Sequence, residues 1–456
     1  MRYKKMVNKN PFSPGKIMID SEKYAGRNDL IIESFSYIKN QRSIFVTGQR
    51  GVGKSSFAMQ LSNLLNKEVK TFERFNINRK DRSINTIVVN YRCTGVETVK
   101  DLIINLLFDL SKKIDRSLKK IPKITKKWKF DLKVFSHENQ RDEYIPTPSI
   151  TKEFSELIIS CFESNPKLYS YDICFMIDEV DLIINKIELG IFIKVFLENL
   201  SDVGFQNIKF ILVGISKGLN LLKQQHPSIT RYLVPIYVPP MTEGELYEII
   251  NRALAETEIK FDEEICQQIY MLSQGFPDPV HLIGYEIYNY LINHNYNDNS
   301  QIFESVLKKI TTIIKKEEFL SIKNKIPNYD CERLLLEMAK INQEFVHINI
   351  LSRRINVSEE ECNKQCKLLT KNNFLEQNGL GSFRFMDPLF RIYINMVNIE
   401  SEVSIERIKA FMKLNTIINQ SYQSSTDKEI IKREKLLYNV ILRNYNKTGK
   451  SGFWDL

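Results

Sequence analysis

One stretch, Gly48-Gln49-Arg50-Gly51-Val52-Gly53-Lys54-Ser55, constrains this chain more than any other. It has the spacing G-x-x-x-x-G-K-[ST]. An apolar, β-prone run at 44–46 leads into it and a helical run at 56–65 follows, so the context is strand, glycine loop and helix start. Glycines let backbone N–H groups surround phosphate oxygens, and the helix N-terminus adds the positive end of its dipole. The stretch therefore predicts a nucleoside triphosphate site.

The polar residues of this loop have distinct expected roles. Lys54 supplies a positive charge to the β- and γ-phosphates, and the Ser55 hydroxyl is a ligand for Mg²⁺. A glycine-rich turn in an ordinary α/β domain is the alternative, but the flanking strand and helix favour the phosphate site. The predicted nucleotide-binding residues are Gly48, Gln49, Arg50, Gly51, Val52, Gly53, Lys54, Ser55 and Ser56.

A second apolar run, at 173–177, ends in two carboxylates, Asp178 and Glu179. A buried strand would carry Asp178 to the carboxyl edge of a sheet, where it can hold the hydration shell of Mg²⁺. Glu179, one residue further on, can polarise the attacking water. Acidic residues at a strand end can instead cap the next helix, but the upstream phosphate loop favours the catalytic interpretation.

Two more residues are candidates for completing hydrolysis. Ser216 follows an apolar run at 210–215 and stands where a γ-phosphate or its water would be sensed, although a helix or turn cap explains it nearly as well. Arg231 precedes a short predicted strand at 232–238. It could reach the nucleotide of a neighbouring subunit as an arginine finger, or form a local salt bridge.

Length and composition indicate a soluble protein of several domains. The chain has 456 residues, of which 43% are hydrophobic and 26% charged. No apolar run is long enough to span a bilayer and the N-terminus lacks the apolar core of a signal peptide, so we expect no membrane partner and a cytoplasmic location. Seven dispersed cysteines fit a reducing compartment, and Cys362 and Cys366 are expected to pack rather than to bind a metal.

The net charge of +10 is concentrated in one tract. Between Lys112 and Lys133 lie nine lysines and Arg116 against Asp115 and Asp131, a local excess of +8. With Trp128 among its aromatic residues, the tract could contact the backbone of a nucleic acid. It could equally be a solvated excursion of the surface.

Breaks in the pattern divide the chain into five expected segments. A lysine-rich insertion at about 112–148 interrupts the second of them. The predicted segments are an N-terminal arm (1–30), an α/β core (31–240), a helical lid (241–325), a winged helix-turn-helix (326–398) and a helical extension (399–456). The lid is expected to begin with a capping box of Thr242 and Glu245 and to break at 275–277, and residues 374–385 are expected to form a hairpin.

The order of these parts resembles the AAA+ ATPases of the origin-recognition and cell-division-control type, and the related archaeal and bacterial ATPases of the signal-transducing (STAND) group. The resemblance covers residues 10–396. Its specific motifs are Walker A at 48–55 and Walker B at 175–179, and a weaker one is the segment Asn10-Pro-Phe-Ser-Pro-Gly followed by Tyr24-Ala-Gly-Arg27.

The resemblance implies a P-loop NTPase fold: a three-layer core with a parallel sheet, a helical lid and a C-terminal winged helix-turn-helix. It implies ATP and Mg²⁺ as cofactors, sensor 1 at Ser216 and an arginine finger at Arg231. The family carries a further arginine in the lid, where this chain reads Phe276-Pro-Asp-Pro-Val-His281. His281 either replaces that arginine or packs inside the lid.

The winged helix could read DNA, but its recognition helix would begin with Glu359, Glu360 and Glu361, which face phosphates unfavourably. A structural or protein-contact role is therefore favoured, although Lys364 and Lys367 give some compensation.

These observations predict an ATP-hydrolysing molecular switch that forms a homo-oligomer or engages an effector protein. In one version the output is DNA-linked, as in replication or transposition, through the lysine tract and winged helix. In the other it is a protein-interaction switch, plausibly in anti-phage defence.

Overall fold

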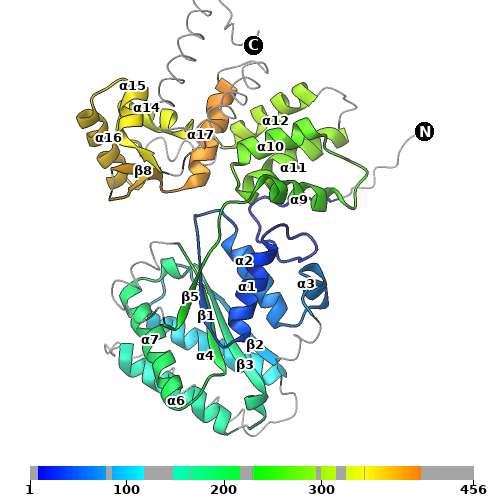
Figure 1. The fold of residues 1–456 in the computed structure, drawn as a ribbon, viewed down its shortest axis with the longest axis vertical. Helices are drawn as coiled ribbons and strands as arrows, with labels where there is room; N and C mark the ends of the chain where they lie inside the picture. The colour runs from blue at the N-terminus through cyan, green and yellow to red at the C-terminus, as the bar shows by residue number, and fades with distance from the viewer. Residues whose placement is uncertain are drawn as a thin grey trace, which may run out of the picture. The chain divides into compact units, whose positions relative to one another are not determined.

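The computed structural model describes residues 9–78, 85–117, 147–164, 166–215, 229, 231–293, 299–314, 325–341, 343, 345–379 and 381–401. The chain forms two compact units, Lys16–Arg252 and a second made of Met1–Gly15 with Ala253–Leu456. The five segment boundaries drawn from the sequence stay a prediction. Figure 1 labels the helices and several of the strands of the two units.

The first unit is built on a parallel sheet of five strands in the order β2-β3-β4-β1-β5. Every residue of β1 and β4 is buried, as expected for parallel strands covered by helices on both faces. The strands are β1 (Ser43–Thr47), β2 (Asn85–Arg92), β3 (Tyr171–Asp178), β4 (Ile208–Val213) and β5 (Leu233–Tyr237).

Helices on two faces make this unit a three-layer structure, which confirms the predicted fold class (Figure 1). One face carries α1 (Asn28–Lys39) and α2 (Lys54–Leu65), with the short α3 (Val69–Arg74) beside α2. The other carries α4 (Val99–Ser117), α6 (Thr147–Glu163) and α7 (Lys186–Asp202). A cluster of five phenylalanines joins α6 and α7 to the sheet: Phe154, Phe175, Phe192, Phe196 and Phe210.

Three features of this unit differ from the sequence-based expectation. Helix α7 was not predicted, although its buried residues Leu189, Ile193 and Phe196 recur at helical spacing. The short helix α3 lies in a segment that reads as polar. The ends of the expected insertion at 112–148 are helical, since α4 continues to Ser117 and α6 begins at Thr147. Residues 118–146, with most of the lysine tract, lie outside the described residues.

The second unit begins with a bundle of helices. It contains the end of α9 (Glu243–Leu254), then α10 (Glu263–Ser273), α11 (Pro277–Asn293) and α12 (Asn299–Ile314). Proline at the first position of α11 fits the break predicted at 275–277, because proline has no N–H to leave unpaired there. Arm residue Phe12 stacks on Phe261 and meets His281 edge-on. Burial lowers the pKa of His281 to about 4, so this histidine is packed in a neutral state.

The remainder of the second unit combines helices with a small antiparallel sheet, and the winged helix-turn-helix expected there stays a prediction. Its helices are α14 (Tyr329–Ala339), α15 (Ile348–Ile355), α16 (Glu359–Lys371) and α17 (Pro388–Ser401). The predicted hairpin is present as β7 (Leu375–Gln377) and β8 (Ser382–Phe385). The two-residue β6 (Val346–His347) adds a third antiparallel strand, giving the order β6-β8-β7. Cys362 and Cys366 are fully buried in the core of this part, as the packing interpretation predicts.

Candidate functional site

The glycine loop connects β1 to α2, and its backbone requires glycine. Gly51 and Gly53 have φ angles of 78° and 95°, a region that side chains with a Cβ rarely adopt. A Cβ added to Gly48 would lie 2.5 Å from the carbonyl oxygen of Val238. Helix α2 begins at Lys54 without a side-chain cap on its N-terminus, so its first N–H groups are suited to an anion.

Lys54 folds back over the loop. Its Nζ donates hydrogen bonds to the carbonyl oxygens of Gly48 (3.1 Å) and Gln49 (2.9 Å). Burial lowers the pKa of Lys54, while the nearby carboxylates of Asp181 and Asp178 oppose that shift. The lysine is thus a half-buried cation near two carboxylates, with two carbonyl contacts that a phosphate could replace.

Asp178 ends β3 at the edge of the sheet that carries the glycine loop. Burial raises the pKa of Asp178, and a hydrogen bond from the Ser55 hydroxyl and one from the Glu179 N–H (2.9 Å) lower it. A serine hydroxyl and a carboxylate in contact are oxygen ligands of the kind that Mg²⁺ prefers. The donor set at this edge therefore fits a magnesium-bound triphosphate.

Glu179 lies just beyond the strand, in a left-handed backbone conformation with φ 56°. Its carboxylate forms an ion pair with Arg92, the last residue of β2. The register of β2 and β3 places Arg92 opposite Asp178, which brings the guanidinium to the acidic edge. The sequence did not single out Arg92, because strand register is a long-range property that one chain does not reveal.

A third carboxylate, Asp181, completes the acidic group. It lies in a short 3₁₀ turn, Val180–Leu182. Its Oδ2 accepts a hydrogen bond from the N–H of Ile215, just past β4. Burial raises the pKa of Asp181. The only sequence signal for it was its place three residues after Asp178.

Arg27 of the arm supports the glycine loop from outside. Its side chain is buried, and one Nη donates to the carbonyl oxygens of Val52 (2.6 Å) and Pro239 (3.0 Å). Its backbone N–H donates to Glu245 of α9 (2.7 Å). The same glutamate forms the predicted capping box with Thr242. The arm, the loop and the start of α9 are thus tied together within the first unit.

The loop after β2 is held by one carboxylate. Glu97 accepts hydrogen bonds from the N–H groups of Thr94, Gly95 and Val96 and from the Thr94 hydroxyl. Burial alone would raise the pKa of Glu97, but these hydrogen bonds lower it to about 2. The loop continues β2 beside Asp178, since the N–H of Cys93 donates to the Asp178 carbonyl oxygen.

Three predicted site residues lie outside this cluster. The Ser56 hydroxyl accepts a hydrogen bond from the arm, from the Met18 N–H at 3.0 Å. Arg231 is exposed and lies just before β5. The first residue of β5 pairs with Ser43 at the start of β1, so Arg231 lies at the amino ends of these strands, whereas the glycine loop follows the carboxyl end of β1. Ser216 lies outside the described residues.

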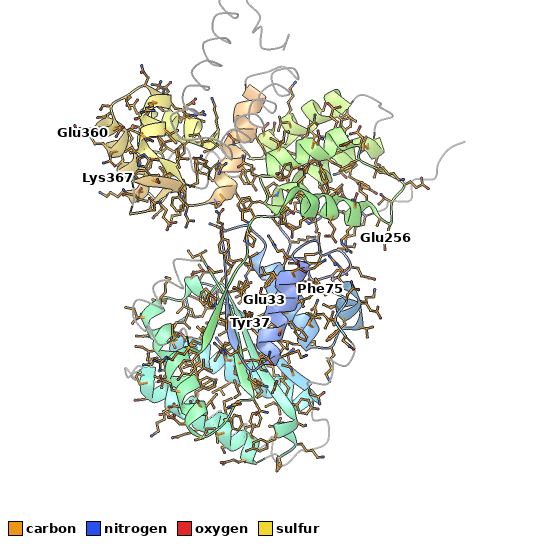
Figure 2. The ribbon with its side chains drawn as sticks, viewed as in Figure 1. Glu33, Tyr37, Phe75, Glu256, Glu360 and Lys367 are labelled. Carbon is orange, nitrogen blue, oxygen red and sulfur yellow. The ribbon has the colours of Figure 1, made fainter. Side chains whose placement is uncertain are left out.

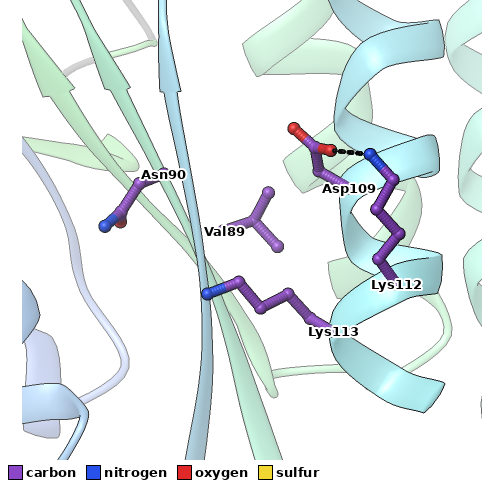
Figure 3. A pocket seen from close by; sticks show the side chains of 5 residues that line it. All are labelled: Val89, Asn90, Asp109, Lys112 and Lys113. Atoms are coloured by element: carbon purple, nitrogen blue, oxygen red, sulfur yellow. Dashed lines mark hydrogen bonds and ion pairs between the residues drawn. The ribbon is translucent and has the colours of Figure 1, made fainter. Parts of the chain in front are cut away.

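A separate cavity of about 260 Å³ lies between β2 and α4 (Figure 3). It is lined by Val89, Asn90, Asp109, Lys112 and Lys113. Lys112 is paired with Asp109 at 3.1 Å and lies over the ring of Phe108. The first two lysines of the basic tract thus pack near β2.

Among the residues that the structure describes, no cluster of three or more histidine, cysteine or acidic side chains has the arrangement of a metal site. Within the same residues, no helix combines the length and the apolar character needed to cross a membrane.

Comparison with known proteins defines the class of this site. Residues 38–222, which contain the glycine loop and all three carboxylates, match the AAA domain family. This part of the chain thus matches an AAA domain, in agreement with the resemblance inferred from the sequence. No curated protein is similar enough in sequence to match the chain.

Solved structures give particular similarities. The chain is similar to the Walker-type ATPase of Pyrococcus abyssi, with 17% identity over 84% of this chain and 99% of that chain, and a TM-score of 0.51. The ADP form of the Aeropyrum pernix ORC2 protein matches with 12% identity over 87% and 97% of the two chains (TM-score 0.43). Cdc6p of Pyrobaculum aerophilum matches with 14% identity over 87% and 98% (TM-score 0.40). The first of these similarities shows a shared fold.

Proposed function

We propose that this protein binds and hydrolyses ATP with Mg²⁺, and that occupancy of the site sets its association with other molecules. The observation that carries the proposal is the convergence of Lys54 with Asp178 and Asp181 at one sheet edge, beside an uncapped helix N-terminus. A half-buried lysine in this setting is suited to a polyphosphate, because phosphate oxygens can replace the loop carbonyls that Lys54 now contacts.

The roles of the chain's own residues follow from their positions. The N–H groups of residues 48–56 hold the phosphates, Lys54 neutralises their charge, and Ser55 and Asp178 hold the magnesium. When bound, Mg²⁺ supplies electrostatic stabilisation of the charge on the transferring phosphoryl group. Glu179 accepts a proton from the attacking water. Arg92 restrains the carboxylate of Glu179 through their ion pair.

We assign Arg231 to a neighbouring copy's site. A five-residue strand is about 16 Å long, and Arg231 lies at the far end of β5 from the glycine loop, so it does not serve its own site. An exposed arginine in that place is suited to acting in trans as an arginine finger within a homo-oligomer. Ser216 is proposed as the residue that senses the γ-phosphate.

For the output, the described residues favour a partner protein over DNA. The first turn of α16 presents Glu359, Glu360 and Glu361. Lys364 lies 3.6 Å from Glu360 and 3.8 Å from Glu361, so nearby acids offset its charge. Figure 2 shows Glu360 and Lys367 on the outside of this helix. An acidic first turn is unsuited to the phosphates that border a major groove.

The DNA-linked alternative rests on the lysine tract at 112–133. It predicts an affinity for DNA that falls steeply with salt and is lost when the tract's lysines become glutamines. If the wild-type protein does not bind duplex DNA, the DNA-linked version is excluded. The effector-switch version then remains, in which a partner such as an anti-phage effector responds to the ATP-bound oligomer.

The direct test of hydrolysis compares two variants. Lys54→Ala should lose nucleotide affinity, whereas Glu179→Gln should keep it and stop turnover. Lys23→Ala, which changes an exposed lysine of the arm, is the matched control and should do neither. Normal turnover in the glutamine variant would contradict the assignment of Glu179 as the base.

A further inference from the structure

Asp181 joins two parts of the site that are far apart in the sequence. Its own turn follows β3 and carries the acidic pair, whereas its hydrogen-bond donor, the N–H of Ile215, follows β4. The backbone N–H of Ile215 donates directly to Oδ2, a hydrogen bond to a carboxylate. The contact therefore fastens the chain beyond β4 to the turn that holds Asp178 and Glu179.

Gly214 makes this contact possible. A Cβ at that position would lie 2.8 Å from Oδ2 and 3.1 Å from Oδ1 of Asp181, and 2.9 Å from a methyl group of Val180. The N–H of Gly214 also donates to the carbonyl oxygen of Val46 in β1, at 3.0 Å. One glycine thus lets the chain after β4 touch both the strand before the glycine loop and the acidic turn.

The second oxygen of Asp181 is buried and has no hydrogen-bond partner among the described residues. A buried carboxylate oxygen without a partner is costly, and such oxygens are retained where the group has a function. Asp181 also exerts the largest electrostatic attraction on Lys54, ahead of Asp178 and Glu179. The carboxylate is therefore part of the nucleotide site and not a distant cap.

We propose that Asp181 is a positioning residue that holds the chain after β4 and the acidic turn after β3 as one unit, so that Glu179 is correctly placed for turnover. Its oxygen bonded to Ile215 provides the fastening, and Gly214 provides the space for it. This inference rests on the proposed ATPase function and adds a residue to it.

The test uses three variants of the full-length chain. Asp181→Ala removes the acceptor, Asp181→Asn keeps an acceptor oxygen but removes the charge, and Gly214→Ala keeps the carboxylate but displaces it. Loss of a hydrogen bond to a charged group predicts a fall in kcat of about 10- to 100-fold for Asp181→Ala and Gly214→Ala. We expect Asp181→Asn to restore kcat to within about 5-fold of wild type.

A second measurement does not depend on activity. In nucleotide-free protein the Ile215 amide should exchange with solvent deuterium about 10-fold faster or more in Asp181→Ala than in wild type, and at a nearly normal rate in Asp181→Asn. If wild-type protein does not hydrolyse ATP, the proposed function fails but this measurement still tests the fastening.

Three results would overturn the inference. The first is unchanged kcat in Asp181→Ala. The second is an equal loss of kcat in the alanine and asparagine variants, which would assign the effect to charge. The third is a parallel loss of nucleotide binding, turnover and thermal stability in Asp181→Ala, which would assign Asp181 a purely structural role.

Discussion

Arg92 and Glu179 form an ion pair across the carboxyl ends of β2 and β3, with 2.5 Å between Nη2 and Oε1. The pair is partly exposed, with 57% of the arginine side chain and 37% of the glutamate side chain accessible. The side-chain hydrogen bond to Glu179 raises the pKa of Arg92. A carboxylate held in this ion pair faces the arginine and is not free to contact an attacking water.

Removing that arginine should therefore release the base. Because exposed ion pairs are worth little, we expect Arg92→Ala to raise basal kcat only about 2- to 5-fold, with KM unchanged. Arg92→Lys keeps a cation at this place and should stay near the wild-type rate. A fall in kcat on changing Arg92 to alanine would show that the pair orients Glu179 rather than restrains it.

Glu97 should make the stability of the first unit depend on acid. Its pKa of about 2 in the folded chain lies below the ordinary value of 4.5, so its contribution is present above about pH 4.5 and is lost as the pH falls towards 2. Glu97→Gln should lower the urea midpoint at pH 7, and its difference from wild type should shrink between pH 4.5 and 2. Glu153→Gln on the exposed face of α6 is the control. A difference that stays constant with pH would contradict this assignment.

The arm should stabilise the glycine loop through Arg27. Arg27→Ala removes two hydrogen bonds from a buried guanidinium to the carbonyl oxygens of Val52 and Pro239. Leaving these carbonyls without a donor should cost about 1–3 kcal/mol of unfolding free energy, measured by urea denaturation. We also expect weaker ATP binding, because Val52 belongs to the loop. Lys194→Ala, which breaks a pair with Glu198 on α7 of the same unit, should leave ATP affinity nearly unchanged.

A buried ion pair near the amino ends of β3 and β4, away from the candidate site, allows a test of stability alone. Lys209 in β4 lies 2.6 Å from Asp172 in β3, and both side chains are almost fully buried. Lys209→Met leaves a buried charge unpaired and should cost about 3–5 kcal/mol of unfolding free energy. The double variant Lys209→Met with Asp172→Leu should recover most of that loss. Equal destabilisation in the single and double variants would show that the pair stabilises the fold through packing and not through its charges.

The parts of the site that the sequence predicted are those whose signals are local. The glycine loop, the start of α2 and the strand ending at Asp178 each depend on a few consecutive residues, and the structure has all of them. The pattern of Thr242 and Glu245 likewise predicted a helix start, because a capping box is a local hydrogen-bond exchange.

The parts that were missed depend on strand register and on close packing between distant segments. Arg92 reaches Glu179 only because β2 pairs with β3 in one register, and Asp181 reaches Ile215 only because Gly214 has no side chain. Arg231 was singled out correctly as lying before a strand, but only the sheet order shows that this strand begins at the edge opposite the glycine loop. These relationships come from tertiary structure and leave no pattern in a single sequence.

The most direct test of the central claim is the binding of a fluorescent ATP analogue to purified full-length protein, with and without Mg²⁺, for wild type and Lys54→Ala. We predict saturable binding to the wild type that Mg²⁺ strengthens, and a loss of at least about 100-fold in affinity for the alanine variant, because a buried charge-assisted contact is removed. Equal affinity of the two proteins, or no binding by the wild type, would contradict the assignment of this site to a magnesium-bound nucleoside triphosphate.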